Sequence, residues 1–545
     1  MASLNQKTDV LGFANAAHLL RRTTFNPNKT LINQFSVLTA SQAVNIIFET
    51  PTYDVPEPIA SDTGQKWIPT FYTPTVTVTT MDSNNQFYSI FSWSLRNAEK
   101  STSIHQKLSL FLHSIFTINL IDVFGLYKFE YDYRSLLNFY AVGSIKTLAK
   151  KITRLNAMHF HLDNRLNTAI APNENYAREF LELFTILKGP QDGIGSYTNY
   201  SELDVQQAAR VLTGFTNISE SQRLSYLDAE CNIPLGKKDI TKHDTGNKTF
   251  SAKFGNQTIV GATTAAGMDV ELDSFIDMVF NQTETAKNYA RRLYRYFVRR
   301  TIDTDVETDI ITPLANNLLD NNYDLTSTIK LLLKSIHFYD EDDTTVGDEI
   351  IGSKIKSPLE LLLIINNQFK LNTVNPITNT PSYLNFYYNY IWGRINLMGF
   401  PLYRPITVAG YPPLYELPNY DKQWITTNNL KNRYLYSIDS LIGGFTYNGF
   451  QYKLDTVSYV RNSGDFSNPS NATLLINEFL ELCFCDVPTG SRYTYFQQAL
   501  LGNLSAINWQ NEWNNYITTS NSASVKTALD RLVKAIVKSP EYQLL

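Results

Sequence analysis

Residues Pro172–Leu187, with the sequence PNENYAREFLELFTIL, form the clearest helix prediction in the chain. Asn173 suits the N-cap position, and Glu174 places negative charge in the first turn, where the helix dipole favours it. Apolar side chains then recur at helical spacing and form one stripe: Tyr176, Phe180, Leu183, Phe184 and Leu187. The stretch therefore predicts an amphipathic helix with one buried face and one polar face.

The polar face of this predicted helix gathers an amide, a guanidinium and two carboxylates. At about 100 degrees per residue, Asn175, Arg178, Glu179 and Glu182 project to the same side. Glu179 and Glu182 are candidate acid and base groups or metal ligands, and Arg178 is a candidate anion anchor. Asn173 and Asn175 are the candidate substrate contacts beside them. The competing interpretation is a solvated face, or a buried salt-bridge network that joins subdomains.

A second helix is predicted over Ser201–Gly214, and residues typical of a helix start and of a helix end mark its two ends. Ser201 and Asp204 have the spacing of a capping box, and Gly214 can end the helix in a left-handed conformation. The next segment changes character, because Gly and Asn punctuate short β-like runs in Ile240–Val260. One or two hairpins are expected there.

The expected fold is mainly α, a multi-helix globular assembly with a small β-hairpin insertion and a loop-rich C-terminal third. A chain of 545 residues exceeds one ordinary core, so roughly two to four packed subdomains are expected. Further helices are predicted at Leu272–Phe280, Thr283–Arg300, Val306–Leu319, Leu325–Ile336 and Pro358–Phe369. The expected regions are 1–100, helical and extended; 101–235, a helical core; 236–265, the hairpin insertion; 266–372, helical; 373–470, loop-rich and aromatic; and 471–545, helical.

Composition narrows the class of protein. The chain is 43% apolar and 18% charged, which is typical of a folded protein. A net charge of -4, with only short basic runs such as Arg291–Arg292 and Arg299–Arg300, argues against a dedicated nucleic-acid binder. The most lipid-like stretch, Leu108–Leu126, contains His113, Asn119 and Asp122, so a buried helix is favoured over a membrane span. The three cysteines are expected to be free thiols.

Other candidate site residues lie around three histidines. A turn at His243–Asp244 can present an acid or base pair to a cleft, with Lys248 close behind and Arg210 on a nearby helix as substrate contacts. A polar hairpin tip is the alternative. The string His159-Phe-His161-Leu-Asp163 would share one side of a strand, but the surrounding pattern is helical, and on a helix the three side chains would not converge.

An ordered series of motifs resembles the mostly bacterial family known as domain of unknown function number 1800, over about residues 15–545. The strongest are Pro172–Thr185, similar to the pattern P-N-E-N-Y-A-R-E-L-x-E-L-H-T, and Asp204–Phe215, similar to D-V-x-x-x-A-R-x-L-T-G-W. His243-Asp244 with Lys248 resembles H-D-x-G-x-K. Weaker matches follow at Leu19–Arg22, Thr285-Ala286, Lys356–Glu360, Gly399, Pro405, Gly410-Tyr411, Trp424-Ile425 and Ser539–Tyr542.

Two departures concern histidines. The family pattern F-W-H-N-H-F is Phe111–Phe116 here, where His113 is kept and Ile115 replaces the second histidine. Phe184 stands where the family has histidine after E-L. The metal candidates that remain are His113 and Asp163, and the second of these fits the family's L-D-N.

The resemblance implies a helical fold and no established reaction. Many relatives are exported and are encoded beside a sulfatase-like protein, which is therefore the expected partner. The polar N-terminus lacks an apolar signal core, so the sequence as written predicts a cytoplasmic protein, or an exported one if a leader has been removed. The sequence gives no oligomeric state.

Two functions are compatible with the sequence. The first is an enzyme whose carboxylate-rich cleft performs acid/base or metal-assisted hydrolysis or group transfer on a polar substrate, with a divalent metal as the cofactor that would fit. The second is a non-catalytic binding or assembly protein, whose Tyr-rich residues 375–465 would contact a partner protein. The absence of H-E-x-x-H, P-loop, G-x-S-x-G and Rossmann motifs removes the usual support for those enzyme classes.

Overall fold

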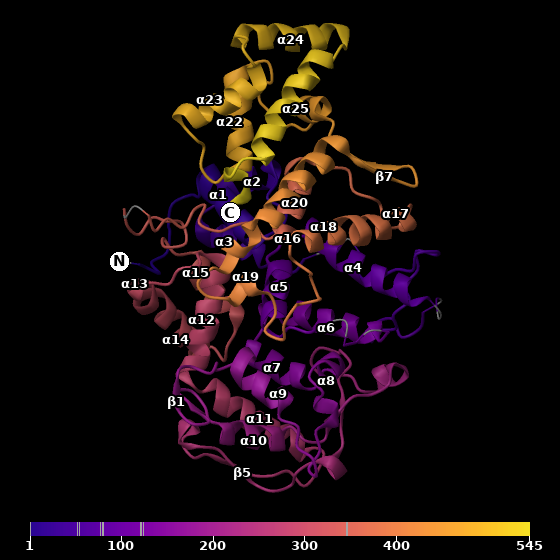
Figure 1. Cartoon of the computed structure of the whole chain (residues 1–545), viewed down its shortest axis with the longest axis vertical. Helices are drawn as coiled ribbons and strands as arrows, with labels where there is room; N and C mark the ends of the chain where they lie inside the picture. The colour runs from indigo at the N-terminus through magenta and orange to yellow at the C-terminus, as the bar shows by residue number, and fades with distance from the viewer. Residues whose placement is uncertain are drawn as a thin grey trace.

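The computed structural model describes residues 2–51, 53, 55–76, 78, 81–119, 122–123, 125–344 and 347–545, and only the backbone of 437–440. It confirms a mainly helical chain with small two-stranded sheets. The molecule is elongated, with the C-terminal helices at one end and the hairpins of residues 191–197 and 248–259 at the other (Figure 1).

The N-terminal helices form the middle of the molecule (Figure 1). Local signals set several of their starts: Asn28 and Asp82 cap α2 and α4, and Thr39 forms a capping box with Gln42 at α3. The helices are α1 Gly12–Thr23, α2 Lys29–Ser36, α3 Ala40–Ile47, α4 Ser83–Lys100, α5 His105–Ile115 and α6 Tyr127–Phe139.

The lower end in Figure 1 contains the strongest sequence motifs. Its helices are α7 Ile145–Thr153, α8 Asn156–His161, α9 Asn175–Glu179, α10 Glu202–Val211 and α11 Gly267–Phe280. At α10 the capping box of Ser201 and Asp204 is confirmed, and Gly214 adopts a left-handed φ of 75° just beyond the helix. The signals that are local in sequence are therefore present as predicted.

The predicted helix Pro172–Leu187 is shorter and less regular than expected. Its α-helical part, α9, begins at Asn175, and the next turn, η3 Phe180–Phe184, is a π-helix. Asn173 does not occupy the N-cap position, but its side chain accepts the backbone N–H of Asn175 at 2.9 Å. The wider π turn rotates the residues that follow, so the face predicted from a period of 3.6 residues does not continue beyond Glu179.

Among the described residues, four small antiparallel sheets lie between the helices. The hairpin predicted within residues 240–260 is confirmed as β5 paired with β6. The sheets are β1 Gln191–Gly193 with β2 Ser196–Tyr197, β3 Phe215–Thr216 with β4 Lys237–Lys238, β5 Lys248–Thr249 with β6 Thr258–Ile259, and β7 Phe445–Tyr447 with β8 Phe450–Tyr452.

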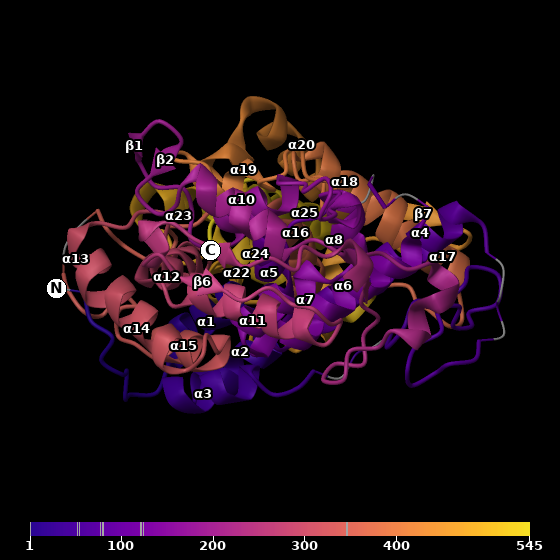
Figure 2. The same ribbon diagram turned by 90° about the horizontal axis from the view of Figure 1, so that it is seen from below.

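The helices predicted between residues 272 and 369 are confirmed, with one π turn, η7 Glu307–Ile311, inside the third. In both views α13, α14 and α15 lie on the side of the N-terminus, opposite α4 and α17 (Figures 1 and 2). Their bounds are α12 Thr283–Phe297, α13 Thr304–Val306, α14 Thr312–Asp320, α15 Leu325–Leu333 and α16 Pro358–Gln368.

The prediction of a loop-rich C-terminal third is wrong, because most of that third is helical. Pro, Asn and Gly within 373–470 occur at helix starts and short connections rather than in one long loop. The helices are α17 Thr380–Leu384, η8 Asn385–Trp392, α18 Gly393–Leu397, α19 Pro412–Tyr415, η9 Tyr420–Ile425, α20 Thr427–Ile438, η10 Asp439–Gly443, α21 Thr456–Asn462, α22 Ala472–Cys483, α23 Gly490–Leu501, α24 Ala506–Thr519 and α25 Ala523–Val537.

The tyrosines of residues 375–465 mostly fill the core rather than the surface. The buried rings in this region are Tyr383, Tyr387, Tyr390, Tyr403, Tyr411, Tyr420, Tyr436, Tyr452 and Tyr459. Tyr388 of η8 stacks on Trp392, with ring centroids 5.1 Å apart, and meets Phe91 of α4 edge-on. Aromatic side chains bury large areas, so this composition stabilises the packing of α4 on η8.

Within the described part of the chain, no helix is both long and apolar enough to cross a bilayer. The predicted buried helix within 108–126 corresponds to α5, which ends at Ile115. The cysteines are free thiols, as expected; Cys231 and Cys483 are buried and Cys485 is partly exposed.

Candidate functional site

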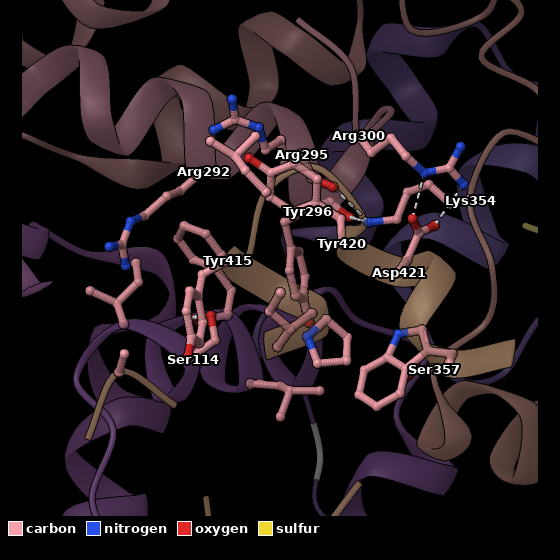
Figure 3. A pocket seen from close by; sticks show the side chains of 18 of the residues that line it. Ser114, Arg292, Arg295, Tyr296, Arg300, Lys354, Ser357, Tyr415, Tyr420 and Asp421 are labelled. Carbon is pink, nitrogen blue, oxygen red and sulfur yellow. Dashed lines mark hydrogen bonds and ion pairs between the residues drawn. The ribbon is translucent and has the colours of Figure 1, made fainter. Parts of the chain in front are cut away.

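A cavity of about 290 Å³ lies where several segments distant in sequence meet (Figure 3). Its walls come from α5, from the C-terminal half of α12, from residues 354–360 at the start of α16, and from residues 400–424. The volume lies near the lower limit for small-molecule sites, roughly 300 Å³. The cavity is therefore large enough for a compact ligand.

Helix α12 supplies the cationic wall of the cavity. Asn288, Arg292, Arg295 and Tyr296 follow the i, i+4, i+7, i+8 spacing that places side chains on one helix face, and all four line the cavity. The opposite face of α12 is apolar and packs into the core through residues such as Leu293. Because the apolar face of α12 packs into the core, its polar face with Arg292 and Arg295 lines the cavity.

Arg292 has no acidic partner among the described side chains. Its Nη2 donates to the carbonyl oxygen of Leu183 at 2.8 Å, and its Nε donates to Asn288 Oδ1 at 3.1 Å. Burial lowers the pKa of the Arg292 guanidinium to about 10. The group stays charged at neutral pH, and only neutral oxygens compensate that charge.

Arg295 is also without a carboxylate partner in the described part of the chain. Its guanidinium lies over the Tyr420 ring, 5.1 Å from the centroid, and its Nε is buried without a hydrogen-bond partner. Burial lowers the pKa of Arg295 below its usual range. The neighbouring Arg291, which does not line the cavity, pairs instead with both Glu284 and Glu307.

The third arginine of the cavity is neutralised. Arg300 forms a two-pronged pair with Asp421, with Nε–Oδ1 at 2.6 Å and Nη2–Oδ2 at 3.2 Å. Asp421 also accepts the backbone N–H of Ile355 at 2.7 Å. Both oxygens of the Asp421 carboxylate therefore have hydrogen-bond donors near the start of α16, and this carboxylate neutralises neither Arg292 nor Arg295.

Lys354 extends toward the middle of the cavity (Figure 3). Its Nζ donates to the carbonyl oxygens of Arg295 at 2.7 Å and Tyr296 at 2.5 Å, which belong to the last turn of α12. A cation at a helix C-terminus is favoured by the helix dipole. Burial nevertheless lowers the pKa of Lys354 to about 7, with Arg22 acting in the same direction.

Glu360 is the second acidic side chain in the cavity wall, and it too is engaged. It forms a capping box with Ser357 at the start of α16 and an ion pair with Lys107, whose side chain is only 1% exposed. Burial opposes ionisation of Glu360, but Lys107 and Lys354 outweigh it and lower the pKa to about 2. Four cationic and two acidic side chains therefore line the cavity, and both acids have close cationic partners.

Aromatic rings form the remaining wall. Phe111 contacts Tyr296, with centroids 5.2 Å apart, and Phe400 contacts Trp424 at 5.1 Å. Tyr420 has no hydrogen-bond partner for its hydroxyl among the described residues, and burial raises the pKa of that hydroxyl. A ligand in this cavity would meet guanidinium groups on one side and ring faces on the other.

The predicted polar face of α9 lies outside this cavity, although Leu183 and Leu187 of the same segment line it. Arg178 pairs with Glu202 at 2.7 Å and with Glu174 at 3.1 Å. Glu182 is held by Lys188 at 3.0 Å and by the Tyr200 hydroxyl at 3.1 Å. These two predicted residues thus belong to partly exposed ion-pair networks.

Glu179 differs from its neighbours, because no described residue hydrogen-bonds to its carboxylate. Burial raises the pKa of Glu179, Glu182 raises it further, and Arg178 and His161 lower it. His161 Nδ1 lies 2.6 Å from Asp122 Oδ2, and its Nε2 is buried without a partner. Sequence analysis placed His161 only in a metal string and did not link it to Glu179.

Asn173 and Asn175 make local backbone contacts rather than lining the cavity. The Asn173 side chain accepts the N–H of Asn175, and the Asn175 amide donates to the carbonyl oxygen of Leu162 at 3.2 Å. Both amides therefore fix the start of α9 against the end of α8.

The predicted pair His243–Asp244 and its neighbour Lys248 belong to a separate network. His243 Nε2 lies 2.9 Å from Glu271 Oε2, and Lys248 Nζ lies 2.5 Å from Glu271 Oε1, all with side chains at most 1% exposed. Asp244 pairs with Arg210 at 2.7 Å and 3.2 Å. The structure brings these four predicted residues close to Glu271, which sequence analysis missed. His243 and Lys248 lie in the interior, and the Arg210–Asp244 pair is partly exposed.

The metal candidates are not assembled into a ligand set. His113 is fully buried and contacts the hydroxyls of Tyr133 at 2.6 Å and Tyr411 at 2.9 Å, and Asp163 pairs with Arg165 at 3.3 Å. His159 is buried with neither ring nitrogen hydrogen-bonded, so the string 159–163 does not converge. Among the described residues, no group of three His, Cys, Asp or Glu side chains is placed to hold a metal ion.

The family of the chain is established by comparison with family models. The model of the family described as "Protein of unknown function (DUF1800)" matches residues 18–544. The chain belongs to this family. No curated protein and no solved structure matches it. Membership in DUF1800 supplies no reaction, so the function has to be argued from the site.

Several of the weaker DUF1800 motifs meet around the cavity. Ser357 and Glu360 come from the Lys356–Glu360 motif, and Trp424 from the Trp424-Ile425 motif. Ile115, which stands where the family pattern has its second histidine, is also in the wall. Lys354 carried no signal in the sequence, because an isolated lysine before a helix is a common surface residue.

Proposed function

We propose that this DUF1800 protein binds a small ligand with an anionic group in the cavity, where Arg292 and Arg295 supply the opposite charge. The observation that carries the proposal is the absence of a carboxylate partner for either guanidinium among the described side chains, although both line a partly enclosed cavity. A buried charge is costly unless it is paired. A carboxylate, phosphate or sulfate of the ligand would complete both pairs, and guanidinium forks suit such groups.

The rings around the cavity indicate the rest of the ligand. Tyr296, Phe400, Tyr415 and Trp424 offer faces and edges against which a planar or cyclic body can pack. The expected ligand is therefore a compact ring or short carbon skeleton with one anionic end. Inorganic phosphate or sulfate alone would fill only the cationic part.

Substitution of the two arginines tests the binding function. We expect Arg292→Gln and Arg295→Gln each to weaken binding of phenyl phosphate or benzoate about tenfold or more, because each removes a charge-assisted hydrogen bond of about 1.5–3 kcal/mol. Isothermal titration calorimetry measures the change. Arg291→Gln is the matched control, since Arg291 is adjacent on α12 but pairs with Glu284 and Glu307 outside the cavity. Equal losses in all three variants, or unchanged binding in both pocket variants, would contradict the proposal.

A second function is supported by one feature of the predicted carboxylate face, the environment of Glu179. The His161 imidazole is oriented by Asp122 at 2.6 Å and keeps a second ring nitrogen without a partner, while Glu179 has a raised pKa. A carboxylate–imidazole pair with one free nitrogen is suited to general acid/base catalysis. The reaction class would be metal-free hydrolysis or group transfer on a polar substrate.

Activity measurements test this second function. On a panel of nitrophenyl esters, phosphates and glycosides, we expect Glu179→Gln to lower kcat/KM about 100-fold or more, the usual contribution of a general acid or base. Glu174→Gln is the control, because Glu174 precedes the same helix and only pairs with Arg178. A wild-type protein inactive on the whole panel, or equal effects of the two variants, would remove acid/base catalysis at this face.

A further inference from the structure

We propose that Lys354 is a nucleophile whose amine condenses with the carbonyl group of an anionic aldehyde or keto acid held in the cavity. The inference rests on the proposed anion binding and adds a covalent step to it. The structure supports it through the position of Nζ, the charges around that atom and a proton donor in the same wall.

The hydrogen bonds of Lys354 leave one position of its nitrogen open. Two N–H bonds point to the carbonyl oxygens of Arg295 and Tyr296, at 2.7 Å and 2.5 Å. A tetrahedral amine has one further position, for a third proton or for the lone pair. No described residue occupies it, and the side chain enters the cavity from the wall opposite Arg292 (Figure 3).

The charged groups that face Lys354 come from several segments. Arg22 of α1 and Lys107 of α5 disfavour its protonated form, whereas Glu360 of α16 and Asp421 of η9 favour it. The two acids are already paired, Glu360 with Lys107 and Asp421 with Arg300, and neither forms an ion pair with Lys354. Burial and the cations prevail and bring the pKa of Lys354 to about 7, so a large share of the amine is uncharged at neutral pH.

If Lys354 only capped the C-terminus of α12, cations close to its amine would not be required. The carbonyl oxygens of Arg295 and Tyr296 and the dipole of α12 stabilise the ammonium form. The nearby cations Arg22 and Lys107 act against that form. Amines desolvated beside other cations are a recurrent means of making a lysine nucleophilic.

The condensation balances without any added reagent. The Lys354 nitrogen attacks the carbonyl carbon, a C–N bond forms, and the electron pair of the C=O bond moves to oxygen. That oxygen takes a proton from the Tyr420 hydroxyl, whose raised pKa keeps it protonated beforehand. The nitrogen then loses one proton to the Tyr420 phenolate. The hydroxyl of the carbinolamine leaves as water together with the remaining proton of the nitrogen, and the products are an imine and one water molecule.

Pyridoxal 5′-phosphate is the probe, because it combines a ring, a phosphate and an aldehyde in one compact molecule. The full-length protein is incubated with it near pH 7, and borohydride reduces any imine to a stable secondary amine. Peptide mass spectrometry then locates the label. We expect Lys354 to be labelled about tenfold or more faster than the exposed Lys538.

Two further measurements separate the covalent step from anion binding. Pyridoxine 5′-phosphate lacks the aldehyde, so it reports binding alone by calorimetry. Lys354→Arg keeps the charge and the donors to the α12 carbonyl oxygens, and we expect it to bind pyridoxine 5′-phosphate within a few-fold of wild type but to lose the label at this position.

The possible outcomes separate the nucleophilic role of Lys354 from anion binding in the cavity. Binding of pyridoxine 5′-phosphate without preferential labelling of Lys354 overturns the nucleophile and leaves anion binding intact. Labelling of Lys354 that is unchanged by Arg292→Gln and Arg295→Gln supports the nucleophile and overturns the anion site. Absence of both binding and labelling overturns both.

Discussion

Glu360→Gln is expected to lower the free energy of unfolding by about 3–5 kcal/mol, because it leaves a buried cation without its partner. The cation is Lys107, whose side chain is 1% exposed and ion-paired with Glu360. The same change removes negative charge from the cavity wall, so we expect anion affinity to rise several-fold while stability falls. Urea unfolding monitored by circular dichroism, and calorimetry with phenyl phosphate, measure the two effects.

In the wild-type protein, the contribution of Glu360 to stability should also appear as a pH dependence of the free energy of unfolding. The pKa of Glu360 is lowered from 4.5 to about 2 in the folded state. Its contribution is therefore fully present above pH 4.5 and is lost as the pH falls toward 2. The Glu360→Gln protein should lack this part of the acid sensitivity.

A double variant controls for the loss of buried charge. Lys107→Met/Glu360→Leu replaces both charges by apolar groups of similar size, and such replacements are often close to neutral. We expect it to recover most of the lost stability, apart from the capping box at Ser357. A single variant as stable as wild type, or a double variant less stable than the single one, would contradict the ion-pair account.

Local signals in the sequence were sufficient to predict much of the helical fold. The capping box at Ser201 and Asp204 depends on residues three positions apart, and the structure has it where it was expected. The stretch Pro172–Leu187 shows the limit of such signals. Its periodicity gave the helix but not the π turn at Phe180–Phe184, since one extra residue in a turn leaves no distinct pattern in the sequence.

Composition misled the prediction for the C-terminal third. Tyr, Asn and Pro are typical of loops and of recognition surfaces, and residues 375–465 are rich in all three. Here most of the tyrosine rings are buried between helices, as in the contact of Tyr390 of η8 with Tyr436 of α20. Whether a ring fills a core or faces solvent depends on tertiary packing, which a single sequence does not reveal.

The cavity could not be predicted for a related reason. The sequence drew attention to the pairs Arg291–Arg292 and Arg299–Arg300, but it could not show which of these arginines have acidic partners. The answer depends on Glu284 and Glu307, which reach Arg291, and on Asp421, which reaches Arg300 across 121 positions. Only the three-dimensional arrangement leaves Arg292 and Arg295 facing an open space with excess positive charge.

The second large effect is expected at the lower end of the molecule, where Glu271→Gln should lower the free energy of unfolding by about 3–5 kcal/mol. Glu271 Oε2 accepts hydrogen bonds from His243 and, at 2.6 Å, from the backbone N–H of Ala262, and Oε1 lies beside Lys248. All three side chains are at most 1% exposed, so Lys248 would remain charged and unpaired inside the protein.

Glu271 also joins several elements of this end of the molecule. It lies on α11, Lys248 lies in β5, and His243 Nδ1 contacts the carbonyl oxygen of Thr213 just after α10, at 2.8 Å. The variant should therefore loosen the β5–β6 hairpin first, and hydrogen exchange should rise in residues 243–262 before it rises in the cavity region.

A neighbouring carboxylate on the same helix provides the control. Asp273 pairs with Lys150 at the surface, where its side chain is 48% exposed, and exposed pairs contribute about 0–1 kcal/mol. Asp273→Asn should therefore leave stability and hydrogen exchange almost unchanged. If Glu271→Gln were equally mild and binding of phenyl phosphate fell instead, the interpretation of His243, Lys248 and Glu271 as a buried structural network would be wrong.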